Sequence, residues 1–159
     1  MKREQAAASL AAGLAPRGCT NLKLRQLTRR VGQHYDRIVG TCGLKTTQYS
    51  LLSHIARLGP LRPGDLAAAM EMEASTLTRN LKPLVAQGWI EIGPGADGRT
   101  RAVTATAAGE AKRAEAQREW KRAQLALNKK LGEGRVAELH ALLDDCLARI
   151  TDTGEGTDG

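Results

Sequence analysis

The stretch from Leu61 to Thr104 constrains the fold most, because two different periodicities follow each other within it. Residues 63–70 open with a proline, which is well tolerated in the first turn of a helix, and continue as a short apolar segment. A break at 71–73 separates this segment from a second one, 75–87. One face of this second segment is apolar and consists of Leu77, Leu81, Leu84 and Val85. The opposite face is mainly polar and consists of Ser75, Arg79, Lys82 and Ala86. The pattern predicts a short helix, a tight turn and a second helix, which is the helix-turn-helix arrangement.

Pro83 lies inside the second helix and predicts a bend or an early loosening there.

A β-hairpin is predicted directly after this pair of helices. Residues 89–92 alternate in polarity as a short strand, 93–98 are rich in glycine and proline, and 99–104 return as a second strand. Two strands alone are marginally stable, so the hairpin must pack against the helices as a wing.

Long amphipathic helices are predicted on both sides of this module. Apolar residues recur at helical steps from Leu22 to Gly40, and a second helix capped by Thr46 or Thr47 runs to Leu58. Two further helices follow Thr106, with a break near 132–134. The fold class is therefore mainly α (α+β). The expected order is a flexible arm (1–17), a dimerisation helix (18–44), a winged helix-turn-helix (45–105), long helices (106–150) and a disordered tail (151–159).

Charge and composition narrow the function further. Lys and Arg outnumber Asp and Glu by 24 to 17, and the resulting net charge of +7 favours a polyanionic partner. Only four aromatic residues are present (Tyr35, Tyr49, Trp89 and Trp120), which argues against recognition of single strands by stacking. No apolar run is long enough for a bilayer and no signal peptide is evident, so a cytoplasmic location without membrane contact is expected. Cys19, Cys42 and Cys146 have no Cys-x-x-Cys spacing, and Cys42 and Cys146 are interpreted as packing residues. No disulfide framework, metal site or cofactor is expected.

The order of these elements and several short motifs resemble the MarR family of bacterial regulators. The similarity covers about residues 20–150, and its matching stretches are 43–52, 65–67, 75–81, 88–90, Asp97-Gly98-Arg99 and Thr106-Ala107-Ala108-Gly109. Ala105 stands where the family usually has an aliphatic residue. The resemblance implies a winged helix-turn-helix fold and a transcriptional regulator, a repressor, that binds double-stranded DNA.

The DNA-binding candidates lie on the second helix and in the wing. Short polar groups and cations suit a helix in the major groove, which selects Ser75, Thr76, Thr78, Arg79 and Lys82. Arg79 is the candidate for a base edge because its planar fork can pair with guanine, whereas Lys82 is assigned to a phosphate. The resemblance implies that Asp97 holds the wing loop and that Arg99 enters the minor groove, although an ion pair with Asp97 is compatible with that role. Arg101 is expected to face the same side as Arg99.

Dimerisation follows from apolar surface outside the DNA-binding module. The faces of Leu22–Ile38 and Val136–Ile150 lie at opposite ends of the chain, and in the family such helices interlock with a second subunit. A two-fold homodimer then presents two helices to a pseudo-palindromic operator.

Two kinds of effector remain open. The resemblance implies a small aromatic or phenolic acid held in a crevice between the dimerisation helices and the DNA-binding module, for which the lining candidates are His34, Tyr35, Arg37, Gln48, Tyr49 and His54. Alternatively, Cys19 resembles the reactive cysteine of the peroxide-sensing branch of the family, because it stands just before a helix and near Arg17, Lys23 and Arg25. The partner tyrosines of that branch are not evident.

An enzyme and a protein-interaction module are the competing classes. The three histidines lie on separate predicted helices, and the sequence has no phosphate loop, no His-Glu-x-x-His and no nucleophile elbow, so no catalytic residue is proposed. A helical module that binds protein through its wing would differ from a DNA-binding protein in showing no salt-dependent binding to duplex DNA.

Overall fold

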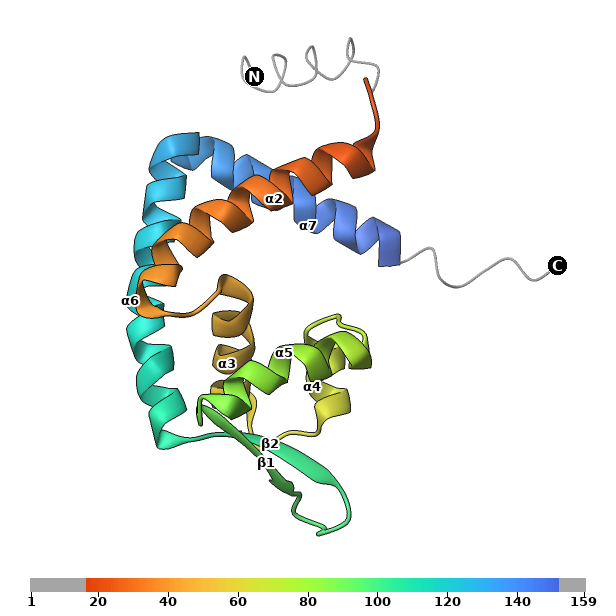
Figure 1. Ribbon diagram of the computed structural model, residues 1–159. Coiled ribbons are helices and arrows are strands. Elements are labelled where there is room, and N and C mark those ends of the chain that lie inside the picture. The colour runs from red at the N-terminus through yellow and green to blue at the C-terminus, as the bar shows by residue number, and fades with distance from the viewer. Residues whose placement is uncertain (1–16, 152–159) are drawn as a thin grey trace, which may run out of the picture. The chain divides into compact units, whose positions relative to one another are not determined.

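The computed structural model describes residues 17–151, and most of them belong to helices (Figure 1). The helices are α2 (Thr20–Val39), the 3-10 helix η1 (Gly40–Cys42), α3 (Thr46–Leu58), α4 (Pro63–Ala69), α5 (Ala74–Ala86), α6 (Ala107–Leu131) and α7 (Glu133–Thr151). The strands are β1 (Ile90–Pro94) and β2 (Arg101–Ala105). The predicted mainly helical fold with a winged helix-turn-helix is thus confirmed. The expected flexible arm and disordered tail lie largely outside the described residues, but α7 includes Thr151, one residue beyond its expected end.

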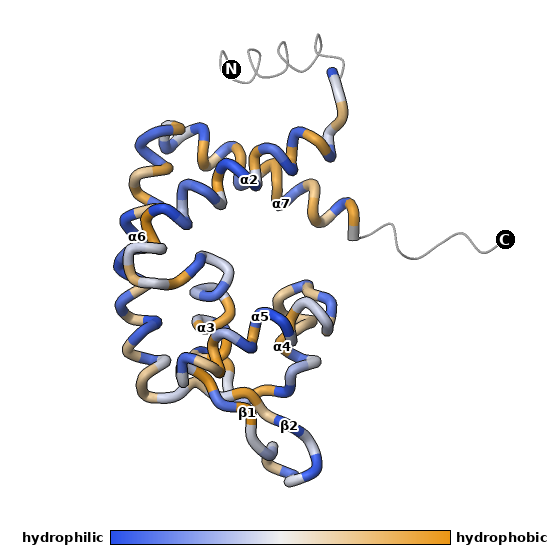
Figure 2. The backbone as a smooth tube through the Cα atoms, in the orientation of Figure 1, coloured by the Kyte–Doolittle hydropathy of each residue, from blue (hydrophilic) through white to orange (hydrophobic). Residues whose placement is uncertain are grey.

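Two structural units divide the chain, and the boundary between Gln33 and His34 falls inside α2. The winged region lies wholly in the second unit. Its core gathers the apolar faces of three helices, namely Leu51, Leu52 and Ile55 of α3, Leu66 of α4, and Leu77, Leu81 and Leu84 of α5. Ile90 and Val103 close this core from the hairpin, and Ala116 closes it from α6. Figure 2 shows the apolar stretches of α3 and α5 that supply these side chains.

The hairpin is antiparallel and is anchored to the helices by a third segment. Ile92 pairs with Val103, and Pro94 pairs with Arg101 next to the loop. Leu61, just before α4, forms an isolated bridge to Val103, whose N–H donates to Leu61 O over 2.8 Å. This bridge was not predicted from the sequence. It attaches the two-stranded wing to the start of the helix-turn-helix.

Three local expectations were wrong in detail. The first strand begins at Ile90 rather than at Trp89, which lies in the turn after α5. The early loosening that was one of the two outcomes expected at Pro83 does not occur. Helix α5 continues to Ala86, because the missing N–H removes a single hydrogen bond and the following backbone groups are bonded. Thr46 does not cap α3: Lys45 is the N-cap residue, and its N–H donates to Gln48 Oε1 over 2.9 Å.

Helix α6 is held at its start by a compact joint. The Thr106 N–H donates to Trp89 O over 3.0 Å, while the Thr106 hydroxyl donates to Gly88 O over 2.6 Å and accepts from Gly109 N–H over 3.0 Å. Gly109 is buried against Trp89. The end of the α5 region and the first turn of α6 are therefore directly bonded to each other.

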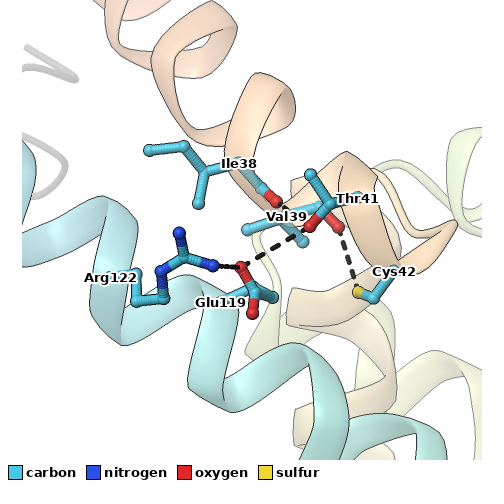
Figure 3. A network of polar contacts seen from close by, with 6 residues as sticks. All are labelled: Ile38, Val39, Thr41, Cys42, Glu119 and Arg122. Atoms are coloured by element: carbon cyan, nitrogen blue, oxygen red, sulfur yellow. Dashed lines mark hydrogen bonds and ion pairs between the residues drawn. The ribbon is translucent and has the colours of Figure 1, made fainter.

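Helix α6 also packs against η1 (Figure 3). The Glu119 carboxylate accepts from Arg122 over 2.6 Å and lies 3.5 Å from the Thr41 hydroxyl oxygen. That hydroxyl has one proton and donates it over the shorter distance, 2.7 Å, to Ile38 O. The Cys42 thiol is buried and donates to Val39 O over 3.0 Å, which agrees with its interpretation as a packing residue. Cys146 is exposed in the single chain, so its interpretation as a packing residue stays a prediction.

Candidate nucleic-acid interface

The tight turn between α4 and α5 sets the outer face of α5. Pro63 occupies the first turn of α4, and Asp65 places a negative charge near that helix N-terminus, where the helix dipole favours it. Glu71 adopts a left-handed φ of 49° in the turn, and Met72 N–H closes the turn by donating to Ala67 O over 2.9 Å. The chain then re-enters a helix at Ala74.

Helix α5 buries one face and exposes the polar one. Ser75, Thr78, Arg79 and Lys82 are exposed, whereas Thr76 is half-buried. The Thr78 hydroxyl donates to Ala74 O over 2.9 Å, so its proton is already used inside the helix. Within residues 17–151, neither Arg79 nor Lys82 has an acidic partner at ion-pair distance. These two cations are therefore available to an external anion.

A groove with apolar walls runs between α5 and the hairpin. Its volume is about 430 Å³, and Lys82 and Arg101 line it together with Val85 and Ile92. Val85 was expected in the core, but its side chain is 42% exposed because the hairpin does not cover it. The groove thus combines two cations with an open apolar floor.

The wing loop is organised around one carboxylate. Asp97 Oδ1 accepts from Arg99 N–H over 3.1 Å, from Thr100 N–H over 3.0 Å and from the Thr100 hydroxyl over 2.6 Å. The Thr100 side-chain hydrogen bond lowers the pKa of Asp97 from 3.8 to about 2, with smaller contributions from backbone hydrogen bonds and from Arg62. The nearest ion-pair partner of Asp97 is Arg62, at 3.8 Å. Arg99 lies in the loop and Arg101 in β2, so strand alternation does not place them on one side as expected.

The six candidates for ligand binding do not share one site. Tyr49 and His54 line a cavity of about 170 Å³ between α3 and α6, together with Thr46, Ser50, Ser53, Arg57 and Trp120. The polar groups of His34 and Tyr35 are used elsewhere: His34 Nε2 lies 2.9 Å from Ala123 O, and the Tyr35 hydroxyl donates to Gln124. Burial raises the pKa of Tyr35, which keeps this phenol protonated. Gln48 accepts from Lys45 N–H, and Arg37 is exposed.

The cavity also contains two hydroxyl groups without partners. The oxygens Thr46 Oγ1 and Ser53 Oγ are buried, and neither forms a hydrogen bond within the described part of the chain. The ring centroids of Tyr49 and Trp120, two residues that line the cavity, are 6.3 Å apart. His54 Nδ1 lies 2.9 Å from Ser50 O, which assigns the ring proton to Nδ1 and leaves Nε2 as an acceptor.

Cys19 is exposed and stands at the very start of α2. Its carbonyl accepts from Lys23 N–H over 3.1 Å, so Cys19 takes the N-cap position. Among residues 17–151 no group of three or more His, Cys, Asp or Glu side chains could hold a metal ion. No helix in that range is long and apolar enough to cross a membrane.

Comparison with known proteins places this geometry in a family. The profile described as MarR family matches residues 43–100. The crystal structure of the transcriptional regulator MosR from M. tuberculosis is 30% identical, with a TM-score of 0.69 over 85% of this chain and 99% of MosR. The chain belongs to the MarR family.

Two further relatives agree with this assignment. YwoH, an uncharacterised HTH-type transcriptional regulator of Bacillus subtilis, is 28% identical over 90 residues, which cover 57% of this chain and 66% of YwoH. A MarR variant from E. coli, solved in complex with operator DNA, is 23% identical and shares the fold, with a TM-score of 0.72 over 80% of this chain and 92% of that one. MosR has also been solved in complex with DNA, with a TM-score of 0.64, 30% identity and coverage of 81% and 98%.

The structure of this MarR-family chain adds residues that sequence reasoning did not select. Thr100 holds the wing loop, and Thr46, Ser53, Arg57 and Trp120 complete the cavity. Arg57 had a sequence signal, because it follows His54 by three residues and shares its helical face. Trp120 had none, because its proximity to α3 arises only from the packing of α6.

Proposed function

We propose that this chain is a transcriptional regulator, a repressor, that binds double-stranded DNA in a sequence-specific manner through α5 and the wing. The observation that carries the proposal is that Arg79 and Lys82 are exposed and without ion-pair partners in the described residues. They lie on a helix whose opposite face buries Leu77, Leu81 and Leu84. The wing adds Arg99 in its loop and Arg101 in β2, and Arg101 lines the same groove as Lys82. The crystal structure of MosR with DNA supports it, because MosR shares the fold and 30% of its sequence.

Arg79 and Lys82 have different roles in this proposal. Arg79 contacts a base edge, so its effect depends on the sequence of the site, whereas Lys82 contacts a phosphate and contributes equally to every sequence. The Lys82 and Arg101 side chains line one groove, which suits the sugar-phosphate backbone running between helix and wing.

Binding is measured by fluorescence anisotropy on a duplex selected from a random library and on a duplex of scrambled sequence. Arg79→Ala should cost about 1–3 kcal/mol on the selected duplex and much less on the scrambled one. Lys82→Ala should weaken binding to both duplexes alike. It should also reduce the slope of log K against log salt concentration by about 1 for each phosphate contact removed. Lys121→Ala, an exposed charge on α6, is the matched control.

Equal losses on both duplexes would make Arg79 a phosphate contact. The absence of salt-dependent binding to any duplex would refute DNA binding and favour the alternative, a helical module that binds protein.

We also propose that the regulator acts as a homodimer in the cytoplasm on a pseudo-palindromic operator. Leu22, Leu24 and Leu27 of α2 and Leu125 and Leu142 beyond the winged region are all more than a third exposed, and a second copy of the chain would cover them. Leu142→Glu should shift sedimentation toward the monomer. Leu58→Glu alters a similarly exposed leucine within the winged region and should leave the dimer intact.

For the effector, the cavity between α3 and α6 supports a small phenolic or aromatic acid. Arg57 and the two partnerless hydroxyls of Thr46 and Ser53 supply cationic and donor groups for a carboxylate, and Tyr49 and Trp120 supply aromatic walls. The free Nε2 of His54 can accept a phenolic proton. The volume of about 170 Å³ suits a single ring rather than a drug-sized molecule.

Thermal unfolding with benzoate and 4-hydroxybenzoate tests this site. A ligand at 100 times its dissociation constant stabilises by about 2.7 kcal/mol, so the melting temperature should rise with concentration. Arg57→Ala should abolish the rise, and Arg37→Ala, an exposed arginine outside the cavity, should not. A rise that persists in Arg57→Ala would place the ligand elsewhere.

Release by thiol oxidation at Cys19 is the second candidate, favoured by its exposure at the start of a helix. Under this mechanism Cys19→Ser keeps DNA binding but loses the release of DNA by peroxide. The buried Cys42 provides the control, because Cys42→Ser should leave that response unchanged. A normal peroxide response in Cys19→Ser would eliminate this candidate.

A further inference from the structure

The tip of the wing is built from residues with little conformational preference of their own. Gly98 has a φ of 64°, and its N–H donates to Gly95 O over 2.9 Å. Gly95 N–H in turn donates to Thr100 O over 2.7 Å. Because glycine gives the backbone wide freedom, this loop needs side-chain bonds to adopt one shape.

Those side-chain bonds converge on Asp97, and Thr100 supplies two of the three donors. Its N–H and its hydroxyl both point at Oδ1, and the hydroxyl makes the shorter contact, 2.6 Å. The third donor is the N–H of Arg99 itself, at 3.1 Å. The backbone of Arg99 is therefore clamped between Asp97, which accepts its N–H, and Thr100, which fixes the carboxylate.

The surroundings of Thr100 are shaped to its hydroxyl. A Cβ at Gly95 would lie 2.6 Å from Thr100 Oγ1 and 3.3 Å from Thr100 O, so a side chain at position 95 would displace the hydroxyl from Asp97. Arg62 reaches Asp97 only at 3.8 Å, and both side chains are about half exposed, so this ion pair contributes little to holding the loop.

We propose that Thr100 is a positioning residue for Arg99: its hydroxyl locks the Asp97 carboxylate, which holds the Arg99 backbone so that its side chain extends toward DNA from a fixed point of the wing. The proposal rests on the proposed function, since it assigns Thr100 a role through the Arg99–DNA contact. A loop already ordered before binding loses less entropy when it binds, and this is how the hydroxyl raises affinity.

The experiment is a double-mutant cycle on DNA affinity. Thr100→Val keeps the branched shape and the backbone bonds but removes the donor, Thr100→Ser restores the donor, and Arg99→Ala removes the group that is positioned. Thr104→Val makes the same chemical change within β2, outside the loop, and is the matched control. Affinity for the selected duplex is measured by fluorescence anisotropy for each variant and for Thr100→Val combined with Arg99→Ala.

Thr100→Val should weaken binding roughly threefold to tenfold, the range expected for one net hydrogen bond and its ordering effect. Thr100→Ser should bind as wild type does, and Thr104→Val should be unchanged. In the Arg99→Ala background, Thr100→Val should have no further effect, because the residue that it positions is gone.

Three results would overturn the inference: unaltered binding by Thr100→Val, an equal loss with and without Arg99, or unaltered binding by Arg99→Ala. These results are distinct from failure of the proposed function. In that case the wild-type chain itself would show no salt-dependent affinity for duplex DNA.

Discussion

Gly109→Ala tests the joint between the winged region and α6. Gly109 is the third residue of α6, and a Cβ added there would lie 1.9 Å from Trp89 O and 2.8 Å from Trp89 C. Carbon and carbonyl oxygen normally meet at about 3.3 Å, so the helix or the Trp89 backbone must move by more than 1 Å. Both neighbours are backbone, and neither can rotate out of the way.

The energetic cost follows from what such a movement breaks. The Thr106 N–H bond to Trp89 O and the Thr106 hydroxyl bond to Gly88 O span the same joint, and each contributes about 1 kcal/mol. Overpacking adds about 1–3 kcal/mol, while the higher helix propensity of alanine returns up to about 1 kcal/mol. We therefore expect Gly109→Ala to lower the free energy of unfolding by about 2–4 kcal/mol.

Urea unfolding followed by circular dichroism, at one fixed protomer concentration, measures this change. Gly134→Ala is the matched control: Gly134 also lies in the first turn of a long helix, and no atom lies within 4 Å of its added Cβ. It should be neutral or slightly stabilising. If Gly109→Ala were as stable as Gly134→Ala, the joint would be able to relax and the argument from close approach would fail.

Two further predictions concern the wing and the core. The folded-state pKa of Asp97 is lowered to about 2, so its hydrogen bonds stabilise the wing above the unfolded pKa near 4 and are lost as the pH falls through about 2. The amide nitrogen shift of Thr100 should therefore titrate in NMR spectra with a midpoint near 2, and a midpoint near 4 would contradict the hydrogen-bond assignment. In the core, Leu51→Ala should cost about 2–5 kcal/mol in urea unfolding because Leu51 is fully buried. Leu58→Ala should cost well under half as much, since Leu58 is 49% exposed; similar costs would mean that Leu58 is covered in solution.

The helices and their buried faces could be predicted because apolar spacing records them directly. Leu77, Leu81 and Leu84 are buried as their periodicity required. Val85 failed the same rule, because the burial of a residue at the edge of an apolar stripe depends on what packs beside the helix. The hairpin leaves Val85 in an open groove.

Features that depend on contacts distant in sequence could not be predicted. The N-terminus of α3 is capped partly from α2, where Asp36 Oδ1 accepts the Thr46 N–H over 2.8 Å, so the short-range signal of a Thr cap was misleading. The isolated bridge from Leu61 to Val103 involves one residue on each side, so no alternation of apolar and polar residues in the sequence could indicate it. Trp120 reaches the cavity only through the packing of α6 against α3.

Helix α6 contacts the rest of the second unit at two separate places. At its start, Thr106 and Gly109 bond it to the backbone that leaves α5, and farther along, Glu119 and Trp120 lie against η1 and the aromatic side of α3. Hydrogen bonds therefore join α6 to the Gly88–Trp89 backbone at its start, whereas packing holds it at Glu119 and Trp120. Loosening the Thr106 joint should therefore detach the start of α6 from the end of the α5 region while leaving the cavity and the outer face of α5 chemically unchanged.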